Sequence, residues 1–130
     1  MKLRVRGSSI RLRLTRTEVE RLRGAEGRVS DQVRFGPQNL LSYAIVREPS
    51  PSTGPTPLLR ATFDGAGITV FAPDSVVSTW AGSERVGFDA EQSVGDGPSL
   101  RILVEKDWNC LTAREGEEDV DTFPNPNLTC

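Results

Sequence analysis

The chain has 130 residues, of which 36% are hydrophobic and 26% charged, with a formal net charge of −2. This length fits one domain with an appended tail and leaves little room for two domains. No stretch approaches the roughly 18 consecutive apolar residues of a membrane helix, and the opening residues alternate charged with aliphatic side chains, unlike a signal peptide. We therefore expect a soluble, cytoplasmic protein.

Charge is spread unevenly along the chain. Residues 1–34 carry ten basic and four acidic side chains, whereas residues 105–130 carry two basic and seven acidic ones. Two interpretations stay open. Either the two segments neutralise each other, within one domain or between copies in a homo-oligomer, or the basic segment faces an anionic ligand and the acidic segment screens it when the ligand is absent.

The first elements are a hairpin and a helix. Aliphatic side chains alternate over residues 3–14, and the change of parity across residues 7–9 predicts a tight turn between two strands. Thr15 followed by Glu18 forms a capping box, which predicts that a helix begins there. Gly24 is placed to end this helix, which is about two turns long and amphipathic.

Extended segments follow on both sides of a proline-rich stretch. Residues 29–35 and 40–46 predict two antiparallel strands joined by a turn. Residues 48–57 contain four prolines, which remove backbone donors and predict a solvated loop. Residues 59–63 and 68–72 alternate around an Asp-Gly-Ala-Gly turn, which is the clearest hairpin signal in the sequence.

The last part of the chain predicts a second helix, two strands and a tail. Pro73 fits the first turn of a helix that Gly82 ends. Residues 86–91 and 100–108 predict two strands joined by a Gly-rich turn. From residue 112 to residue 130 few side chains are apolar and five are acidic, so we expect an acidic tail outside a domain that spans residues 1–111.

Together these elements predict an α+β fold. Short turns between strands and the absence of a strand-helix-strand rhythm favour a mainly antiparallel sheet, or a small partly open barrel, with two short helices. A parallel α/β fold fits poorly. Leu12, Phe63 and Val104 are expected to share one apolar layer.

Several reaction classes are excluded by residue types. The sequence has no histidine, so Ser-His-Asp and Cys-His nucleophile systems and imidazole metal sites are ruled out. Its glycines occur singly or in turn-like pairs and form no phosphate loop of the common nucleotide-binding types. No residue of the sequence is predicted to be catalytic, and the sequence favours a non-catalytic role.

Cys110 and Cys130 leave three alternatives. They stay free thiols in a reducing cytoplasm, form a disulfide, or hold a metal ion together with carboxylates or with a second copy of the chain. Two sulfurs alone are too few for a tetrahedral zinc site.

Six arginines occupy strand positions between aliphatic neighbours. They are Arg4, Arg6, Arg11, Arg13, Arg60 and Arg101. If one concave face of the sheet gathered them, their guanidinium groups would bind phosphate oxygens in pairs. Glu105 and Asp107 would then hold Mg²⁺, which bridges phosphates. The alternative is an outward polar face on which these cations pair with acids of neighbouring strands.

Nucleic acid is a less favoured partner. The basic strands lack interleaved aromatic side chains for base stacking, the net charge is negative, and no known nucleic-acid-binding motif is present.

Two stretches carry a family resemblance, residues 1–15 (MKLRVRGSSIRLRLT) and residues 100–111 (LRILVEKDWNCL). They resemble the opening and closing signatures of a family of small uncharacterised bacterial proteins, in which residues 123–126 (FPNP) are also typical. The resemblance spans nearly the whole chain and implies no activity, catalytic residue or cofactor. The triphosphate-tunnel enzymes also line a barrel with basic side chains, but their Glu-x-Glu-x-Lys motif is replaced here by Lys2, Arg4 and Arg6.

The sequence thus favours a soluble binding or interaction module that needs no cofactor and self-associates. The alternative is an enzyme or sensor for a phosphorylated small molecule, with the arginines as anion ligands and Mg²⁺ on the two carboxylates.

Overall fold

The computed structural model describes residues 1–49, 58–108 and 123. Eight strands and two helices follow in the order β1 (Lys2–Arg6), β2 (Ser9–Leu14), α1 (Arg16–Arg23), β3 (Arg28–Arg34), β4 (Leu40–Glu48), β5 (Arg60–Phe63), β6 (Gly67–Pro73), α2 (Asp74–Ala81), β7 (Gly87–Gln92) and β8 (Leu100–Lys106). The expected proline-rich loop and acidic tail lie almost entirely outside the described residues. No helix in the described part is long and apolar enough to cross a membrane.

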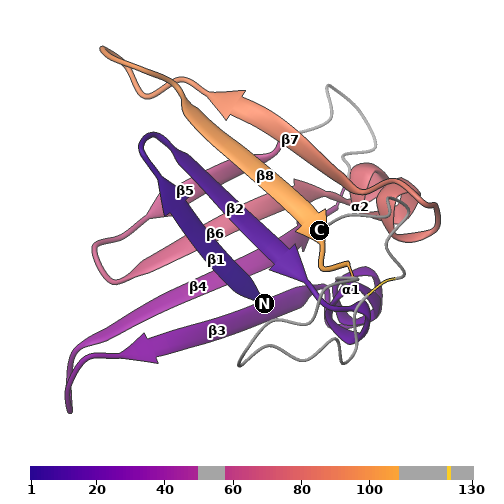
Figure 1. Cartoon of the computed structure of the whole chain (residues 1–130), viewed down its shortest axis with the longest axis horizontal. Helices are drawn as coiled ribbons and strands as arrows, with labels where there is room; N and C mark the ends of the chain where they lie inside the picture. Colours follow the sequence, from indigo (N-terminus) through magenta and orange to yellow (C-terminus); the bar gives the residue numbers. More distant parts are fainter. Residues whose placement is uncertain (50–57, 109–122, 124–130) are drawn as a thin grey trace.

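The strands form two four-stranded sheets (Figure 1). Sheet A has the order β1-β2-β8-β7 and sheet B the order β3-β4-β6-β5. All four predicted hairpins are present as antiparallel pairs. The two central pairs, β2 with β8 and β4 with β6, are parallel. The α+β prediction is confirmed, and the strands form two open sheets without a closed barrel.

Both helices are present within one residue of their predicted bounds, although Pro73 precedes α2 as its N-cap and does not lie in the first turn. The Thr15 side chain accepts a hydrogen bond from the Glu18 amide and the Glu18 side chain bonds the Thr15 amide, which completes the capping box of α1. Pro73 occupies the same position before α2 without a side-chain hydrogen bond. Gly24 and Gly82 follow the last turns of the two helices.

The core lies between the two sheets and under the helices. Leu12 and Val104 are buried, as expected, but Phe63 at the end of β5 is 68% exposed. The prediction for Phe63 was wrong because the two sheets diverge at the end of the molecule opposite the helices (Figure 1). Trp80 is fully buried and packs edge-on against Phe88, with their ring centroids 5.1 Å apart.

The two halves of the chain repeat one plan of hairpin, helix and hairpin. Core residues of the first hairpin and helix recur 58 positions later in the same structural place: Ile10 and Ile68, Leu12 and Val70, Leu14 and Ala72, Val19 and Val77, Leu22 and Trp80. Gly7 and Gly65 turn the two first hairpins and both have positive φ, 54° and 92°. These matches indicate an internal repeat that the sequence analysis did not find.

Hydrogen bonds between the halves repeat as well. The Ser42 amide donates to the Ala66 carbonyl at 3.0 Å, and the Arg101 amide donates to the Ser8 carbonyl at 2.9 Å. Each of these bonds begins a parallel pair, β4 with β6 and β2 with β8. Sheet A therefore combines the first hairpin of the first half with the last hairpin of the second half, and sheet B has the reciprocal arrangement. The halves are interlocked.

Candidate anion-binding site

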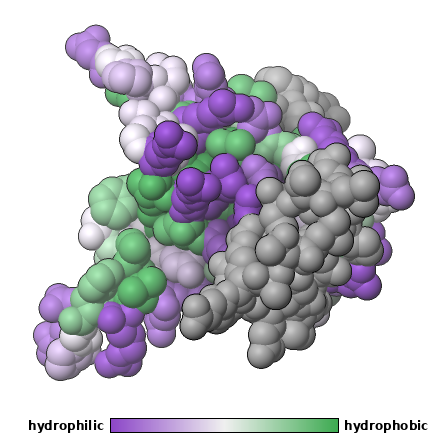
Figure 2. Space-filling model, viewed as in Figure 1, coloured by the Kyte–Doolittle hydropathy of each residue, from purple (hydrophilic) through white to green (hydrophobic). Residues whose placement is uncertain are grey.

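One outer surface of sheet A gathers six of the sixteen basic side chains of the sequence. Ile10, Leu12 and Leu14 of β2 face the core, so the alternation of the strand turns Arg11 and Arg13 outward. In the space-filling view, hydrophilic residues lie on the front of the molecule among hydrophobic ones (Figure 2).

The strand register fixes the members of this surface. Lys2 lies opposite Arg13, Arg4 opposite Arg11, and Arg101 opposite Ser9. Residues directly opposite in neighbouring strands share a face. We call the resulting set the basic face: Lys2, Arg4, Arg6, Arg11, Arg13 and Arg101.

Acidic neighbours engage four of these six cations. Glu105 lies between Arg11 and Arg13, with its two oxygens 3.6 and 3.9 Å from their Nε atoms. Arg101 lies 3.4 Å from Asp89, and Lys2 lies 3.3 Å from Asp107. These distances and the partial exposure of the groups describe loose surface ion pairs that contribute little to stability.

Arg4 and Arg6 differ from the other four. Both side chains are exposed, and neither has a hydrogen bond or ion pair with any residue that the structure describes. A guanidinium group presents five N–H donors in a planar fork suited to carboxylate and phosphate oxygens. Within the basic face, these two side chains are therefore the cations most available to an external anion.

The sixth predicted arginine is elsewhere. Arg60 lies on the outer face of sheet B, donates two hydrogen bonds to Glu48 and stacks 4.4 Å from the centroid of the Phe71 ring. The hydrogen-bonded Glu48 carboxylate raises the pKa of Arg60. The structure thus brings together five of the six predicted arginines on the outer face of sheet A.

The residues predicted to hold a metal are placed as follows. Glu105 contacts two guanidinium groups, and Asp107 at the end of β8 is buried beside Lys2. Within residues 1–49, 58–108 and 123, no group of three or more Asp, Glu, Cys or His side chains could hold a metal ion. Cys110 and Cys130 lie outside the described residues.

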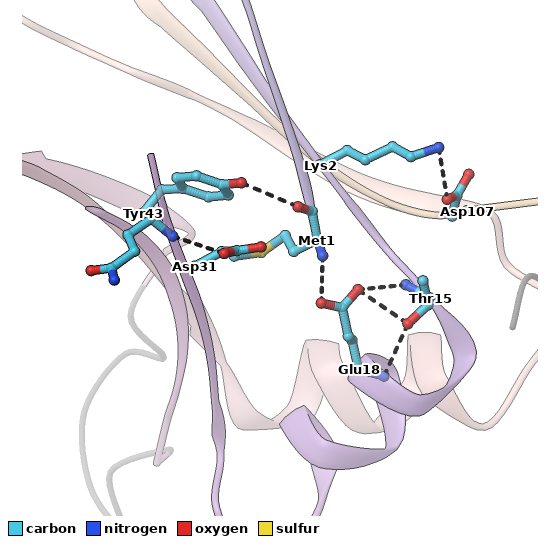
Figure 3. A network of polar contacts seen from close by, with 8 residues as sticks. Met1, Lys2, Thr15, Glu18, Asp31, Tyr43 and Asp107 are labelled. Atoms are coloured by element: carbon cyan, nitrogen blue, oxygen red, sulfur yellow. Dashed lines mark hydrogen bonds and ion pairs between the residues drawn. The ribbon is translucent and has the colours of Figure 1, made fainter. Parts of the chain in front are cut away.

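A polar network holds the start of the basic face in place (Figure 3). The Met1 amine is buried and forms an ion pair with Glu18 of the α1 capping box. The Tyr43 hydroxyl of β4 donates to the Met1 carbonyl at 3.4 Å, and burial raises the pKa of this hydroxyl. These contacts tie β1 to both α1 and sheet B, which positions Lys2 and Arg4.

The internal repeat supplies a comparison for the basic face. On the equivalent hairpin, β5 with β6, the positions of Lys2, Arg4, Arg6, Arg11 and Arg13 are taken by Arg60, Thr62, Asp64, Thr69 and Phe71. Five cations in one hairpin thus correspond to one cation and one anion in the other. The same backbone folds with either set, so the fold does not require the positive charge.

The sequence analysis missed the buried Lys106. Its ammonium donates to the Ser83 carbonyl and lies between 5.1 and 5.9 Å from the ring centroids of Trp80, Trp108 and Phe123. Burial lowers the pKa of Lys106. The alternation of Ile102 and Val104 already pointed residue 106 inward, and this signal would have identified the lysine as buried.

Arg47 occupies the place of Lys106 in the first half. Its guanidinium donates to the carbonyls of Arg23 and Gly24 at 2.9 and 3.0 Å, at the end of α1. Lys106 donates to a carbonyl one residue beyond the C-cap of α2. Both cations lie near the C-terminus of a helix, where positive charge is favourable, and Lys106 is too enclosed to reach a ligand.

Comparison with known proteins identifies a family. A family model described as a family of unknown function (DUF7009) matches residues 1–127. No curated protein and no solved structure gives a match.

Proposed function

The chain belongs to the family of unknown function DUF7009, and we propose that it is a non-catalytic binding module that holds an anionic partner on the basic face of sheet A. The observation that carries this proposal is the pair of exposed guanidinium groups, Arg4 and Arg6, without a partner among the described residues. Uncompensated cations on a rigid sheet attract anions over distances of about a Debye length, roughly 8 to 10 Å.

The alternative explanation is that these charges serve solubility alone. Comparison of the two equivalent hairpins argues against it. Solubility requires charge on the surface but not its concentration on one hairpin, and β5 with β6 carries Thr62 and Thr69 where β1 with β2 carries Arg4 and Arg11. A surface on which cations outnumber acids is typical of proteins that steer an anionic partner.

A phosphorylated small molecule is the second ligand class for the same cations. In that version, an enzyme or sensor would use Mg²⁺ on Glu105 and Asp107. The contacts of Glu105 with Arg11 and Arg13 favour a role in aligning guanidinium groups over a role as metal ligand. A binding titration with inorganic triphosphate, in the presence and in the absence of Mg²⁺, distinguishes the enzyme or sensor from the non-catalytic binding module.

A binding titration tests the proposal. Fluorescein-labelled decaglutamate is the probe, and its anisotropy is followed at low ionic strength. The double variant Arg4→Ser/Arg6→Ser should weaken binding about tenfold, because two exposed ion pairs together contribute about 1.4 kcal/mol.

The matched control is Arg28→Ser/Arg34→Ser. These two arginines lie on the outer face of the edge strand β3, are exposed, and carry the same charge. The control should change affinity less than twofold. Equal losses in both double variants would show a general charge effect and contradict the proposal.

Self-association is a further part of the proposal. The acidic excess of residues 105–130 complements the basic face of another copy, and such pairing is weakened by salt. Light scattering during size-exclusion chromatography at low and high salt measures it, and a monomer in both conditions contradicts it. In this proposal the protein functions in the cytoplasm.

A further inference from the structure

Apart from one bond at a hairpin turn, between Ser9 and the Arg6 carbonyl, side chains bond to the backbone of three of the four edge strands. On β5, the Gln92 amide accepts from the Ala61 N–H at 2.7 Å and donates to the Ala61 carbonyl at 3.0 Å. This amide takes the place of a neighbouring strand and joins the edges of β5 and β7. Such coverage protects an edge from pairing with another chain.

The other two of these edges are covered at one point each. On β3, the Asp31 carboxylate accepts from the Gln32 N–H at 2.8 Å. On β7, the Arg85 guanidinium donates to the Gly87 carbonyl at 3.0 Å. Each contact occupies a backbone group that an incoming strand would need.

The edge of β1 is different. The Met1 carbonyl accepts from Tyr43, and the Arg6 carbonyl accepts from Ser9. Between these ends, in the part of the chain that the structure describes, the backbone of residues 2–5 bonds only to β2. The repeat places Val33 where the other half has Gln92, so no amide covers this edge.

The side chains of β1 define what a neighbouring strand would meet. Lys2, Arg4 and Arg6 face outward, whereas Leu3 and Val5 face the space between the sheets. Val5 is 63% exposed. A strand that pairs with β1 would have its alternate side chains beside the cations on one face and beside Val5 on the other.

We infer that β1 binds an extended peptide segment with alternating acidic and apolar side chains, which adds to sheet A as a fifth strand. This inference rests on the proposed function and names its partner. The N–H and C=O groups of alternate residues within 2–5, those that do not bond to β2, supply the pairing. Arg4 and Arg6 bind the acidic side chains, and Val5 contacts the apolar ones.

The outer surface favours a peptide over a nucleic acid. The outward positions of sheet A are occupied by charged residues, Ser9, Gly87 and Leu103, and by no aromatic side chain. Proteins that bind single-stranded nucleic acids commonly stack bases on aromatic rings. A nucleic acid also lacks the regular N–H and C=O groups that a strand edge pairs with.

The first test uses a capped seven-residue peptide of alternating glutamate and valine. Two further versions carry N-methyl groups, one on every valine and one on every glutamate. Alternate residues of a paired strand direct their N–H and C=O groups to the same neighbour, so only one version loses the hydrogen bonds to β1. We expect the affinities of the two versions to differ at least tenfold, and equal affinities would overturn the inference.

The second test uses Val5→Ser with Phe63→Ser as its matched control. Phe63 is the equivalent residue on β5 and is also exposed, so both variants should fold. Val5→Ser should weaken binding of the peptide about fivefold, in proportion to the apolar contact removed. Phe63→Ser should weaken binding less than twofold. Equal effects of the two variants would contradict binding along β1.

Failures of the two proposals are distinguishable. Decaglutamate binding that depends on Arg4 and Arg6, combined with equal affinities of the two N-methylated peptides, would refute the added strand and retain the anionic partner. Loss of the dependence on Arg4 and Arg6 would refute both. Binding of a ten-nucleotide oligo(dT) more tightly than the peptide, with no effect of Val5→Ser, would assign the face to nucleic acid and overturn the inference.

Discussion

Two hairpins of this protein share a backbone and differ in what they show to solvent. In β1 with β2 and in β5 with β6, the inward positions hold aliphatic residues of similar kind, such as Ile10 and Ile68. The outward positions hold five cations in the first hairpin and a mixed set in the second. The inward residues are constrained by packing between the sheets, whereas the outward residues are free to diverge toward a partner.

The helix ends show the same divergence inside the core. Arg47 and Lys106 both lie near helix C-termini, but Arg47 is half-buried at the surface and Lys106 is enclosed by aromatic rings. Trp80 replaces Leu22 in the second half and helps to build that enclosure. The second half therefore concentrates aromatic packing where the first half has a solvated guanidinium.

The largest expected losses of stability concern these core positions. Trp80→Ala should lower the free energy of unfolding by about 4 kcal/mol, and Leu22→Ala by about 3 kcal/mol. The Trp80→Ala substitution removes more buried side-chain surface than Leu22→Ala does. The Trp80 Nε1 also donates to the Val86 carbonyl at 3.0 Å. Urea unfolding of both variants measures the difference, and a greater loss for Leu22→Ala would contradict the equivalence of packing that we describe.

Truncation of the two helix-end cations should have the next largest effect. Lys106→Ala leaves a cavity and the Ser83 carbonyl without its donor, so we expect a loss of about 2 to 3 kcal/mol. Arg47→Ala removes two hydrogen bonds at a partly solvated site and should cost about 1 kcal/mol. Chemical denaturation again provides the measurement. Similar losses in both variants would show that the aromatic enclosure adds nothing.

The helix starts should differ by less. Thr15→Ala removes the capping box of α1 and should cost about 1 kcal/mol. Pro73→Ala at the start of α2 removes no side-chain hydrogen bond and should cost no more than about 0.5 kcal/mol, through the greater freedom of the unfolded chain. Thermal unfolding of the two variants ranks the two losses of stability. A larger loss for Pro73→Ala than for Thr15→Ala would contradict the stronger capping of α1.

The smallest expected effect is a dependence on pH. Because burial lowers the pKa of Lys106 in the folded protein, the unfolded chain holds the proton to higher pH than the folded chain does. Deprotonation between the lowered pKa and the ordinary value of 10.5 therefore favours the folded state.

Lys106→Met provides the comparison for this prediction. The difference in unfolding free energy, wild type minus Lys106→Met, should increase between pH 8 and pH 10 by urea denaturation. Other titrating groups, Tyr43 among them, act equally in both proteins and cancel. A constant or decreasing difference would show that the ammonium is not destabilised by burial.

Local signals in the sequence predicted the hairpins and helices but not their assembly. The turn at residues 7–9 and the capping box at Thr15 depend on neighbouring residues, which explains why these predictions are confirmed. The parallel pairing of β2 with β8 depends on contacts between residues such as Ile10 and Ile102, and no local pattern encodes it. The internal repeat was not predicted because its equivalent positions share side-chain volume and polarity more often than residue identity.

The candidate site was predictable in part for the same reason. Alternation along β1 and β2 placed Arg4, Arg6, Arg11 and Arg13 on a shared face. The arrival of Arg101 beside Ser9, and the separation of Arg60 onto sheet B, follow from the order of strands in the sheets. Which cations remain unpaired depends on the positions of Glu105 and its neighbours, and the sequence alone does not fix these positions.

Chemical-shift mapping tests the central claim most directly. In ¹H–¹⁵N spectra, titration with decaglutamate should shift the amide signals of residues 2–6 and 9–14 and of Arg101. The equivalent residues 60–64 and 67–72 should remain unchanged. Shifts of equal size in both hairpins, or shifts confined to the second one, would contradict a binding surface on the basic face.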